Sequence, residues 1–457
     1  MELRTSEVAR VTGGRLTGDD VTVAGATIDS RAVRPGQLFV PLVAERDGHD
    51  FVAAAVAAGA AAYLTSCGPV PAGGDASAPA VPAVEVADTT AALEALGRHA
   101  RTLLPDRVVG VTGSVGKTSV KDLLAAVLAV RWPTSANVRS FNNELGVPLT
   151  LLEAPTGTEA LVVEMGARGV GHVKALCDVA APTVGVVTRV AAVHTETFGT
   201  IDDVARAKGE LIEALPPTGV AVLNAEDPRV AAMASRSAAP VVTFGAGGDV
   251  RAEGVVLDDD LAASFRLVAS GPVAVPAPGS AAAGAVVSAD VRLAVRGRHM
   301  VENALAAAAA GLALGMRVDE VAAGLAGAAL SPWRMELSRL PGGARLLNDA
   351  YNANPTSMAA ALDALAALPA GRRVAVLGVM AELGATSAAD HAGVGDHARR
   401  LGIEVVGVGT DAYGGRVVAA DPVAVAAALG PLGADDAVLL KGSRVAGLEH
   451  VAAALGA

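Results

Sequence analysis

The segment VVGVTGSVGKTSV at residues 108–120 limits the fold of this chain more than any other stretch. A valine-rich apolar run is followed by small residues, and Lys117 and Thr118 then begin a segment with the pattern of a helix. Glycine allows the tight turn and the close approach to a ligand that such a loop needs, and a helix N-terminus favours negative charge. The segment therefore predicts a strand, a phosphate-binding loop and a helix, in that order.

The spacing of this loop differs from the usual G-x-x-x-x-G-K-[ST] pattern. Val111 stands where the first glycine is expected, and the glycines are Gly110 and Gly113. A chance glycine-rich turn is the alternative, but the strand, the Lys-Thr pair and the helix are all in register. We therefore expect Lys117 to reach the β- and γ-phosphate oxygens of a nucleotide and the Thr118 hydroxyl to bind Mg²⁺.

The length of 457 residues suggests about three domains, because a domain typically has ~150 residues. Between residues 106 and 330, apolar β-branched runs alternate with helical segments, which predicts a doubly wound α/β domain. The runs that predict its buried parallel strands are 108–111, 160–164, 183–188, 220–224 and 240–244. Residues 250–296 alternate in strand fashion and predict an antiparallel insertion. We predict an α/β protein of three domains: a mixed α/β domain at 1–105, this central P-loop domain at 106–330, and a smaller Rossmann-like domain at 331–457.

Charge and composition narrow the class of protein. The net charge of −11 argues against a general nucleic-acid-binding protein, so an anionic ligand would need a local basic pocket. The N-terminal stretch MELRTSEVARVTGG lacks the apolar core of a signal peptide, and the alanine-rich runs are interrupted before the ~20 residues that span a membrane. Cys67 and Cys177 form no CxxC pair and are expected to be buried free thiols. We therefore expect a cytoplasmic protein without membrane insertion.

Three further residues bear on how the phosphate is used, since the base-reading N-K-x-D element of GTPases is missing. Glu164 ends an apolar strand, where it is either a solvated strand-end residue or a ligand of Mg²⁺. His194 follows the next strand, at the edge where open α/β sheets bind ligands, although a lone histidine is more often structural. Lys208 falls on the apolar face of a predicted helix, so it either extends its ammonium group to solvent or lies inside the site.

Six motifs occur along the chain in the order GVTGSVGKTS, VVEMGA, AKGE, GRHMVENALAA, NDAYNANP and VLLKGSR. In these motifs and their order the chain resembles, over nearly its whole length, the Mur ligases, the ATP-dependent amide-forming enzymes of peptidoglycan precursor synthesis. NDAYNANPTSM with VLGVMAELG looks like the member that adds D-alanyl-D-alanine to UDP-N-acetylmuramoyl-tripeptide. ATIDSRAVRPGQLFVPL and RDGHDF are similar to its uridine-nucleotide domain, whereas the D-N-P-R element of the ligase that adds the third amino acid is missing.

The resemblance implies the reaction and its participants. ATP would phosphorylate the tripeptide carboxylate, and D-alanyl-D-alanine would attack the acyl phosphate to give UDP-N-acetylmuramoyl-pentapeptide, ADP and phosphate. Two Mg²⁺ ions are expected, together with a carbamylated Lys208 that carries negative charge. The protein is expected to be a monomer. The third residue of the tripeptide, meso-diaminopimelate or lysine, stays open, as does N-acetyl or N-glycolyl muramic acid.

The resemblance also gives roles to matching residues. The expected catalytic residues are Lys117, Glu164, His194 and Lys208. The expected metal ligands are Thr118, Glu164, His194 and Lys208. The expected nucleotide-binding residues are Gly113, Ser114, Val115, Gly116, Lys117, Thr118, Ser119, Asn303, Arg334, Asp349 and Tyr351. The expected substrate-binding residues are Ser30, Arg31, Asn142, Asn143, Asn352, Asn354, Lys441 and Arg444.

The chain departs from the family pattern at several positions. Val115 replaces the usual asparagine of the loop, Val379 replaces a usual aspartate, and Met300 and Glu302 alter the H-N-V-x-N pattern. An inactive nucleotide-binding scaffold is therefore one alternative, although the residues Lys117, Glu164, His194 and Lys208 are retained. A folyl-polyglutamate synthetase is the other, although such enzymes lack the uridine-nucleotide domain.

Overall fold

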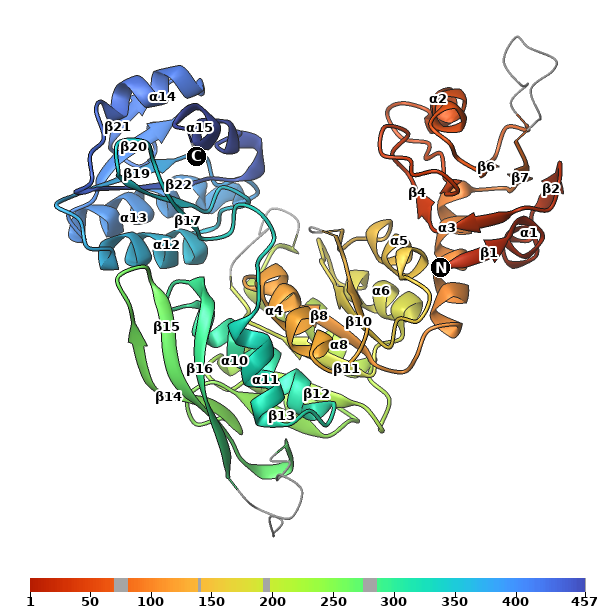
Figure 1. Cartoon of the computed structure of the whole chain (residues 1–457), viewed down its shortest axis with the longest axis horizontal. Coiled ribbons are helices and arrows are strands. Elements are labelled where there is room, and N and C mark those ends of the chain that lie inside the picture. Colours follow the sequence, from red (N-terminus) through yellow and green to blue (C-terminus); the bar gives the residue numbers. More distant parts are fainter. Residues whose placement is uncertain (70–80, 139–140, 192–197, 274–285, 457) are drawn as a thin grey trace.

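The chain forms three successive α/β parts, each with its own main sheet (Figure 1). This computed structural model describes residues 1–69, 81–138, 141–191, 198–273 and 286–456. The N-terminal and C-terminal parts lie on opposite sides of the molecule, and the central part lies between and below them (Figure 1). The predicted fold class, a three-domain α/β protein, is confirmed.

The N-terminal part has a two-stranded and a five-stranded sheet. The small sheet pairs β1 (Glu2–Arg4) with β3 (Thr22–Ala24). The larger sheet has the order β2 (Arg15–Thr17), β7 (Ala83–Glu85), β6 (Ala62–Thr65), β5 (Leu38–Phe39) and β4 (Ala26–Thr27). Its helices are α1 (Thr5–Thr12), the 3₁₀ helix η1 (Gly48–Phe51), α2 (Val52–Ala57) and α3 (Thr89–Thr102). The Asp88 carboxylate caps α3 by accepting the backbone N–H groups of Thr90 and Ala91, at 2.7 and 3.0 Å.

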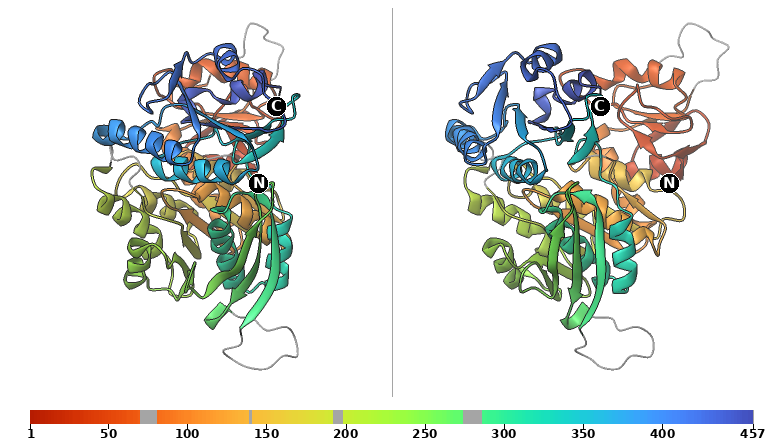
Figure 2. Two further views of the ribbon diagram at one scale, coloured as in Figure 1. Left: turned by 90° about the vertical axis from the view of Figure 1, so that its left-hand side faces the viewer. Right: turned by 60° about the vertical axis from the view of Figure 1, so that its left-hand side comes forward.

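The central part has one nine-stranded sheet, in which the predicted antiparallel segment extends the parallel strands instead of forming a separate sheet. The sheet order is β16 (Val287–Arg296), β15 (Ala262–Ala269), β14 (Val250–Leu257), β13 (Val241–Phe244), β12 (Val220–Asn224), β11 (Val184–Val187), β8 (Val108–Thr112), β10 (Ala160–Glu164) and β9 (Thr134–Ala136). Strands β14–β16 pair antiparallel, and the other pairs are parallel. In Figure 2, strands β14–β16 are the long green strands that run away from the blue C-terminal part.

The direction in which strands are added reverses at β8. Strands β9 and β10, which follow β8 in the sequence, lie on one side of β8. The later strands β11 and β12 lie on its other side. Such a switch point leaves a crevice at the carboxyl ends of the neighbouring strands, where ligands bind in open α/β sheets. The central helices are α4 (Lys117–Ala129), α5 (Gly146–Glu153), α6 (His172–Ala180), α8 (Ile201–Glu213), α9 (Pro228–Ala231), η2 (Ala232–Arg236), η3 (Gly271–Val273), α10 (Met300–Ala313) and α11 (Val318–Ala326).

The alanine-rich helix α10 is buried in the middle of the central part. It packs against α4 on one side and against strands β11–β14 on the other. Residues 306–310 are all alanine, each at most 1% exposed, because these small side chains let the helix approach its neighbours closely. This packing fixes the N-terminus of α10 beside the N-terminus of α4.

The C-terminal part has a six-stranded sheet in which the edge strand β17 is antiparallel and the remaining pairs are parallel. Its order is β17 (Glu336–Arg339), β18 (Arg345–Asn348), β22 (Asp436–Lys441), β19 (Arg372–Leu377), β20 (Glu404–Val408) and β21 (Arg416–Val418). Its helices are α12 (Pro355–Ala367), η4 (Gly384–Thr386), α13 (Ser387–Arg400), α14 (Pro422–Leu429), η5 (Arg444–Ala446) and α15 (Glu449–Ala454).

The two cysteines differ in exposure. Cys177 is buried as predicted, but the prediction was wrong for Cys67, which is exposed in the loop after β6. No helix within the described ranges is long and apolar enough to cross a membrane.

Two glycines of α13 offer a matched test of the packing. A Cβ at Gly393 would meet no atom within 4 Å, whereas a Cβ at Gly395 would lie 2.1 Å from the carbonyl oxygen of Tyr413. We expect Gly393→Ala to raise the free energy of unfolding by about 1 kcal/mol, because alanine favours the helix. We expect Gly395→Ala to lower it by about 1–3 kcal/mol, because the backbone of residue 413 must move. Urea unfolding followed by circular dichroism measures both, and effects of equal sign would contradict the packing.

Candidate active site

The loop between β8 and α4 has the backbone of a phosphate-binding loop. Gly113 and Gly116 adopt φ values of 148° and 84°, which side-chain-bearing residues avoid. A Cβ at Gly113 would lie 2.0 Å from Thr188 Oγ1, and a Cβ at Gly116 would lie 2.5 Å from Asn303 Oδ1. Only glycine therefore fits at these two positions of the loop. The loop leads directly into the N-terminus of α4, which begins at Lys117.

The segment after β11 holds this loop in place. The backbone N–H of Ser114 donates to the carbonyl of Arg189 at 2.7 Å, and the Ser114 hydroxyl accepts the N–H of Ala191 at 3.0 Å. The Thr188 hydroxyl donates to the carbonyl of Val115 at 2.6 Å. Val115 therefore takes part in the loop through its backbone, so the loss of the usual asparagine side chain leaves this anchoring intact.

Lys117 lies inside the loop. Its ammonium group donates to the carbonyls of Gly113 and Ser114, at 2.7 and 3.4 Å. Burial lowers the pKa of Lys117, the carboxylate of Glu164 opposes this change, and the charge of Arg334 adds to it. A polyphosphate in the loop would give this buried cation a closer anionic partner.

Glu164 ends β10 with a buried carboxylate that is 1% exposed. Its Oε1 accepts from the side-chain amide of Asn142 at 2.7 Å. Its Oε2 has no hydrogen-bond partner within the described part of the chain. A buried carboxylate oxygen without a partner is costly, so this atom is suited to accept a cation or a ligand donor. The solvated strand-end alternative is therefore wrong.

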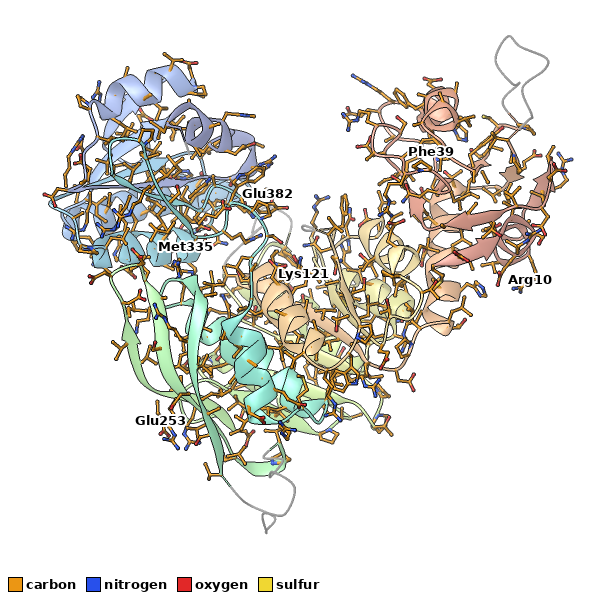
Figure 3. All side chains as sticks on the ribbon, viewed as in Figure 1. Arg10, Phe39, Lys121, Glu253, Met335 and Glu382 are labelled. Carbon is orange, nitrogen blue, oxygen red and sulfur yellow. The ribbon has the colours of Figure 1, made fainter. Side chains whose placement is uncertain are left out.

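Lys121, which is labelled in Figure 3, lies on the next turn of α4 and is connected through Asn137 to the backbone at the end of β10. It is 2% exposed, and its ammonium group donates to the carbonyl of Asn137 at 2.9 Å and pairs with Asp122 at 2.8 Å. The side-chain oxygen of Asn137 accepts the backbone N–H of Glu164 at 2.6 Å. Lys121 was not predicted as a site residue, although a lysine on the inner face of the helix after a phosphate loop was a usable signal.

Lys208 lies inside the site and does not extend to solvent. It lies in α8, is 2% exposed, and its Nζ is 5.7 Å from the ring centroid of Phe198. Burial lowers the pKa of Lys208 well below its usual value, and the charge of Lys117 lowers it further. The neutral amine is therefore more accessible at this position than at an exposed lysine. His194, which the sequence predicts beside it, falls outside the described residues.

An ion pair lies next to the phosphate loop on the α10 side. Arg189 donates to Glu302 through Nε at 3.2 Å and through a terminal nitrogen at 2.6 Å. The side-chain amide of Asn224 donates to the same carboxylate at 2.6 Å. Glu302 precedes Asn303, so the pair fixes the residue that faces Gly116. Glu302 was noted from the sequence only as a departure from the family's H-N-V-x-N pattern, and Arg189 was not predicted. The signal for Arg189 was its position directly after the predicted strand 183–188.

The C-terminal part contributes the opposite wall. Asp349 accepts the backbone N–H of Met335 at 3.2 Å and forms an ion pair with Lys441. Arg334 donates to the Thr118 hydroxyl at 2.9 Å, and its guanidinium lies 4.4 Å from the ring centroid of Tyr351. Arg334 therefore bridges the first turn of α4 and the C-terminal part.

These groups surround one cavity of about 890 Å³, near the upper end of the usual range for ligand pockets. The predicted residues that line it are Gly113, Ser114, Val115, Gly116, Lys117, Thr118, Ser119, Asn142, Asn143, Glu164, Lys208, Asn303, Arg334, Asp349, Tyr351, Asn352, Asn354 and Lys441. Residues from the central and C-terminal parts thus meet at the switch point of the central sheet.

Three predicted residues lie away from this cavity lining. Ser30 and Arg31 belong to the N-terminal part, where Arg31 forms a two-bond ion pair with Asp29, each bond 2.9 Å long. Arg444 stacks over Trp333 at 4.4 Å from the ring centroid and pairs with Glu449 at 2.9 Å. In the described ranges, no group of three His, Cys, Asp or Glu side chains is placed to hold a metal ion.

Gly116→Ala tests the loop. We expect the variant to bind nucleotide on the order of tenfold more weakly, because alanine strains the backbone and displaces Asn303. Titration with a fluorescent ADP analogue measures the affinity. Gly157→Ala is the matched control, since Gly157 has φ 86° and no atom within 4 Å of its added Cβ. Equal affinities of the two variants would contradict the predicted role of Gly116.

Three family models match the chain in succession. They are described as Mur ligase family, catalytic domain, at residues 22–101; Mur ligase middle domain, at 111–311; and Mur ligase, glutamate ligase domain, at 333–444. The UDP-N-acetylmuramoyl-tripeptide–D-alanyl-D-alanine ligase of Mycobacterium tuberculosis (strain H37Rv) is 40% identical over 518 residues, which cover 100% of this chain and 98% of the relative. The enzyme of the same name from Escherichia coli (strain K12) is 37% identical over 465 residues, with coverages of 98% and 97%.

Two solved structures of MurF enzymes are also similar to this chain over nearly its whole length. A crystal structure of MurF from Acinetobacter baumannii has a TM-score of 0.84 and 30% identity, and the match covers 100% of this chain and 99% of that one. The structure of MurF ligase from Thermotoga maritima in complex with ADP has a TM-score of 0.77 and 27% identity, with coverages of 95% and 97%.

Proposed function

The chain belongs to the Mur ligase family, and we propose that it uses ATP to join D-alanyl-D-alanine to UDP-N-acetylmuramoyl-tripeptide in peptidoglycan synthesis. The observation that carries the proposal is the single cavity in which the phosphate loop, Glu164 and Lys208 meet residues of the C-terminal part. Relatives over the full length of the chain bear the name of this activity.

A carboxylate does not accept an amine directly, because oxide is a poor leaving group. Transfer of the γ-phosphoryl group to the carboxylate gives an acyl phosphate, which the amine can attack. Phosphoryl transfer depends on positioning and charge stabilisation. Lys117, the backbone N–H groups of the loop and the N-terminus of α4 supply both. The ADP complex of the T. maritima relative supports ATP as the donor.

The chemistry of the donor set fits magnesium. Glu164 Oε2 has no hydrogen-bond partner among residues the structure describes, and the Thr118 hydroxyl lies on the same cavity. Thr118 and Glu164 would hold one ion, and Glu164 and His194 would help to hold a second. Carbamylation would turn Lys208 into a further, anionic oxygen donor. Mg²⁺, when bound, neutralises the charge of the phosphates. Nucleotide oxygens would complete a site for which the described residues supply no group of three His, Cys, Asp or Glu side chains.

The substrates approach from different parts of the chain in this proposal. The N-terminal domain, 1–105, would bind the uridine nucleotide through Ser30 and Arg31. The C-terminal domain, 331–457, would bring Asp349 and Tyr351 to the nucleotide. Further residues with proposed substrate contacts are Asn142, Asn143, Asn352, Asn354 and Lys441. The predicted contact of Arg444 with the substrate stays a proposal, and Trp333 and Glu449 would position its guanidinium.

The proposal is tested by phosphate release. The protein is mixed with ATP, Mg²⁺, D-alanyl-D-alanine and UDP-N-acetylmuramoyl-tripeptide, and each component is left out in turn. We expect release only from the complete mixture, with UDP-N-acetylmuramoyl-pentapeptide as the product by mass spectrometry. An inactive scaffold would release none, and that result would overturn the proposal. Tripeptides with meso-diaminopimelate and with lysine at the third position identify the accepted substrate.

The proposed carbamate on Lys208 gives a separate prediction. Lys208→Ala should lower ADP formation by at least about 100-fold at saturating bicarbonate and magnesium, because a ligand of the charge-stabilising ions is lost. Lys174→Ala is the control, since Lys174 is exposed and pairs only with Asp178 among described side chains. Undiminished ADP formation by Lys208→Ala would contradict the role of Lys208.

The pH dependence follows from the same residue. Carbamylation consumes the neutral amine, and the lowered pKa of Lys208 keeps that form available near neutrality. As the pH falls through this pKa, the amine takes up a proton and the carbamate is lost. We therefore expect the carbamate signal of enzyme equilibrated with ¹³C-bicarbonate to decrease toward low pH in ¹³C NMR, in parallel with activity.

A further inference from the structure

One buried lysine of α4 has no part in the reaction described above. Lys121 lies one turn after Lys117. The described residues that line the cavity include Lys117, Thr118 and Ser119 but not Lys121. An ammonium group is costly to bury unless it is paired and hydrogen-bonded. The position of Lys121 therefore indicates a task other than direct contact with a ligand of the cavity.

The ion pair of Lys121 with Asp122 does not by itself explain this burial. The two charged groups are 2.8 Å apart, and Asp122 also accepts the backbone N–H of Ser331 at 2.7 Å. In a buried pair, the free energy needed to remove both charges from water offsets much of their attraction. Such a pair is a poor source of stability, so the other printed contact of Lys121 is the more informative one.

That contact is with Asn137, the residue directly after β9. Lys121 Nζ donates to the backbone carbonyl of Asn137 at 2.9 Å. The side-chain oxygen of Asn137 accepts the backbone N–H of Glu164 at 2.6 Å, and its side-chain nitrogen donates to the carbonyl of Phe141. Asn137 is buried, and its carbonyl, its side-chain oxygen and its side-chain nitrogen are each held by a different residue.

These contacts hold Glu164 at two points. The first is its backbone N–H, which Asn137 accepts. The second is Oε1, which accepts from the side-chain amide of Asn142 at 2.7 Å, and Asn142 directly follows the Phe141 carbonyl that Asn137 holds. The contacts leave Oε2, which has no hydrogen-bond partner in the described part of the chain.

We propose that Lys121 is a positioning residue of the proposed magnesium site. It fixes Asn137, and Asn137 fixes Glu164 so that Oε2 is available to a cation. The inference rests on the metal role that the proposed function gives to Glu164. Mg²⁺ requires ligands close to ideal octahedral positions, and a carboxylate that is already fixed loses less conformational freedom when the ion binds.

The sign of the effect separates positioning from simple electrostatics. Lys121 is a cation two hydrogen bonds away from Glu164, so removal of its charge alone would strengthen the binding of a metal ion. Loss of its hold on Asn137 would weaken that binding, because Glu164 would no longer be fixed. Weaker binding is therefore the result that positioning predicts.

Two variants use this difference. Lys121→Met removes the ammonium group and keeps a side chain of similar length. The double variant Lys121→Met/Asp122→Asn also removes the opposite charge, so its net charge equals that of the wild type. Asparagine keeps an oxygen for the N–H of Ser331, and replacement of a buried ion pair by neutral groups is often tolerated.

Mn²⁺ serves as the probe. It is titrated into protein held in slight excess over ADP, and electron paramagnetic resonance measures the free ion. We expect Mn²⁺ to bind about 10- to 100-fold more weakly to both Lys121 variants, the usual loss when a residue that orients a metal ligand is removed. Leu128→Ala removes a buried side chain further along α4 and is the control for a loosened helix. Its affinity should stay within about twofold of the wild type, since it shares no partner with Glu164.

Hydrogen exchange of the Glu164 amide gives a second readout that needs neither metal nor activity. The N–H of Glu164 donates to Asn137, so its protection, measured by NMR, should fall in both Lys121 variants. The amides of Val184–Val187 in β11 should keep their protection, because β11 and β10 lie on opposite sides of β8.

The outcomes are distinct. Unchanged or tighter Mn²⁺ binding in the Lys121 variants overturns the inference, as does unchanged protection of the Glu164 amide. Recovered affinity in the double variant also overturns it, because the unpaired charge of Asp122 would then be the cause, and so does an equal loss in Leu128→Ala.

Glu164→Gln separates the inference from its premise. Normal Mn²⁺ binding by Glu164→Gln refutes the metal role of Glu164, and the inference falls with it. A loss in Glu164→Gln without a loss in the Lys121 variants refutes the inference alone. Phosphate release tests the proposed function independently, since these binding measurements need neither the dipeptide nor the UDP-linked substrate.

Discussion

The phosphate loop depends on a lack of room at two glycines, and the rest of the site is arranged around this constraint. Thr188 occupies the space that a side chain at Gly113 would need, and Asn303 does the same at Gly116. The loop is thereby fixed to β11 on one side and to α10 on the other. Because α10 is buried among small side chains, its N-terminus cannot move without disturbing the core of the central part.

The linker between the central and C-terminal parts carries the second constraint. Asp122 accepts the backbone N–H of Ser331 at 2.7 Å, which ties the start of the linker to α4. Trp333 and Met335 then adopt positive φ values of 61° and 51°, so the chain on both sides of Arg334 is strained. Arg334 contacts Thr118 while the linker is in this shape. The position of the C-terminal part is therefore coupled to the first turn of the helix that follows the phosphate loop.

The local pattern of apolar residues predicted the strands and helices that carry the site. Contacts between side chains that are distant in the sequence could not be predicted in this way. The strands 160–164 and 220–224 end where the continuous apolar runs end, so Glu164 was assigned to a strand end correctly. The helical period also placed Lys208 on the inner face, and burial then decided between its two possible environments. No local rule pairs Arg189 with Glu302 or turns Arg444 toward Trp333, because tertiary packing alone sets those contacts. The roles given to the site residues by resemblance stay predictions.

The charge of the cavity explains how an acidic protein can hold a polyphosphate. The chain has a net charge of −11, yet Lys117, Lys208 and Arg334 converge on one crevice. Burial lowers the pKa values of both lysines; the charge of Arg334 lowers that of Lys117 further, and the charge of Lys117 lowers that of Lys208 further. A polyphosphate reverses this change at Lys117, because an adjacent anion favours the charged amine. Lys208 would gain nothing from that proton in a site that holds magnesium as proposed, and the proposed carbamate would remove the repulsion between the two neighbouring lysines.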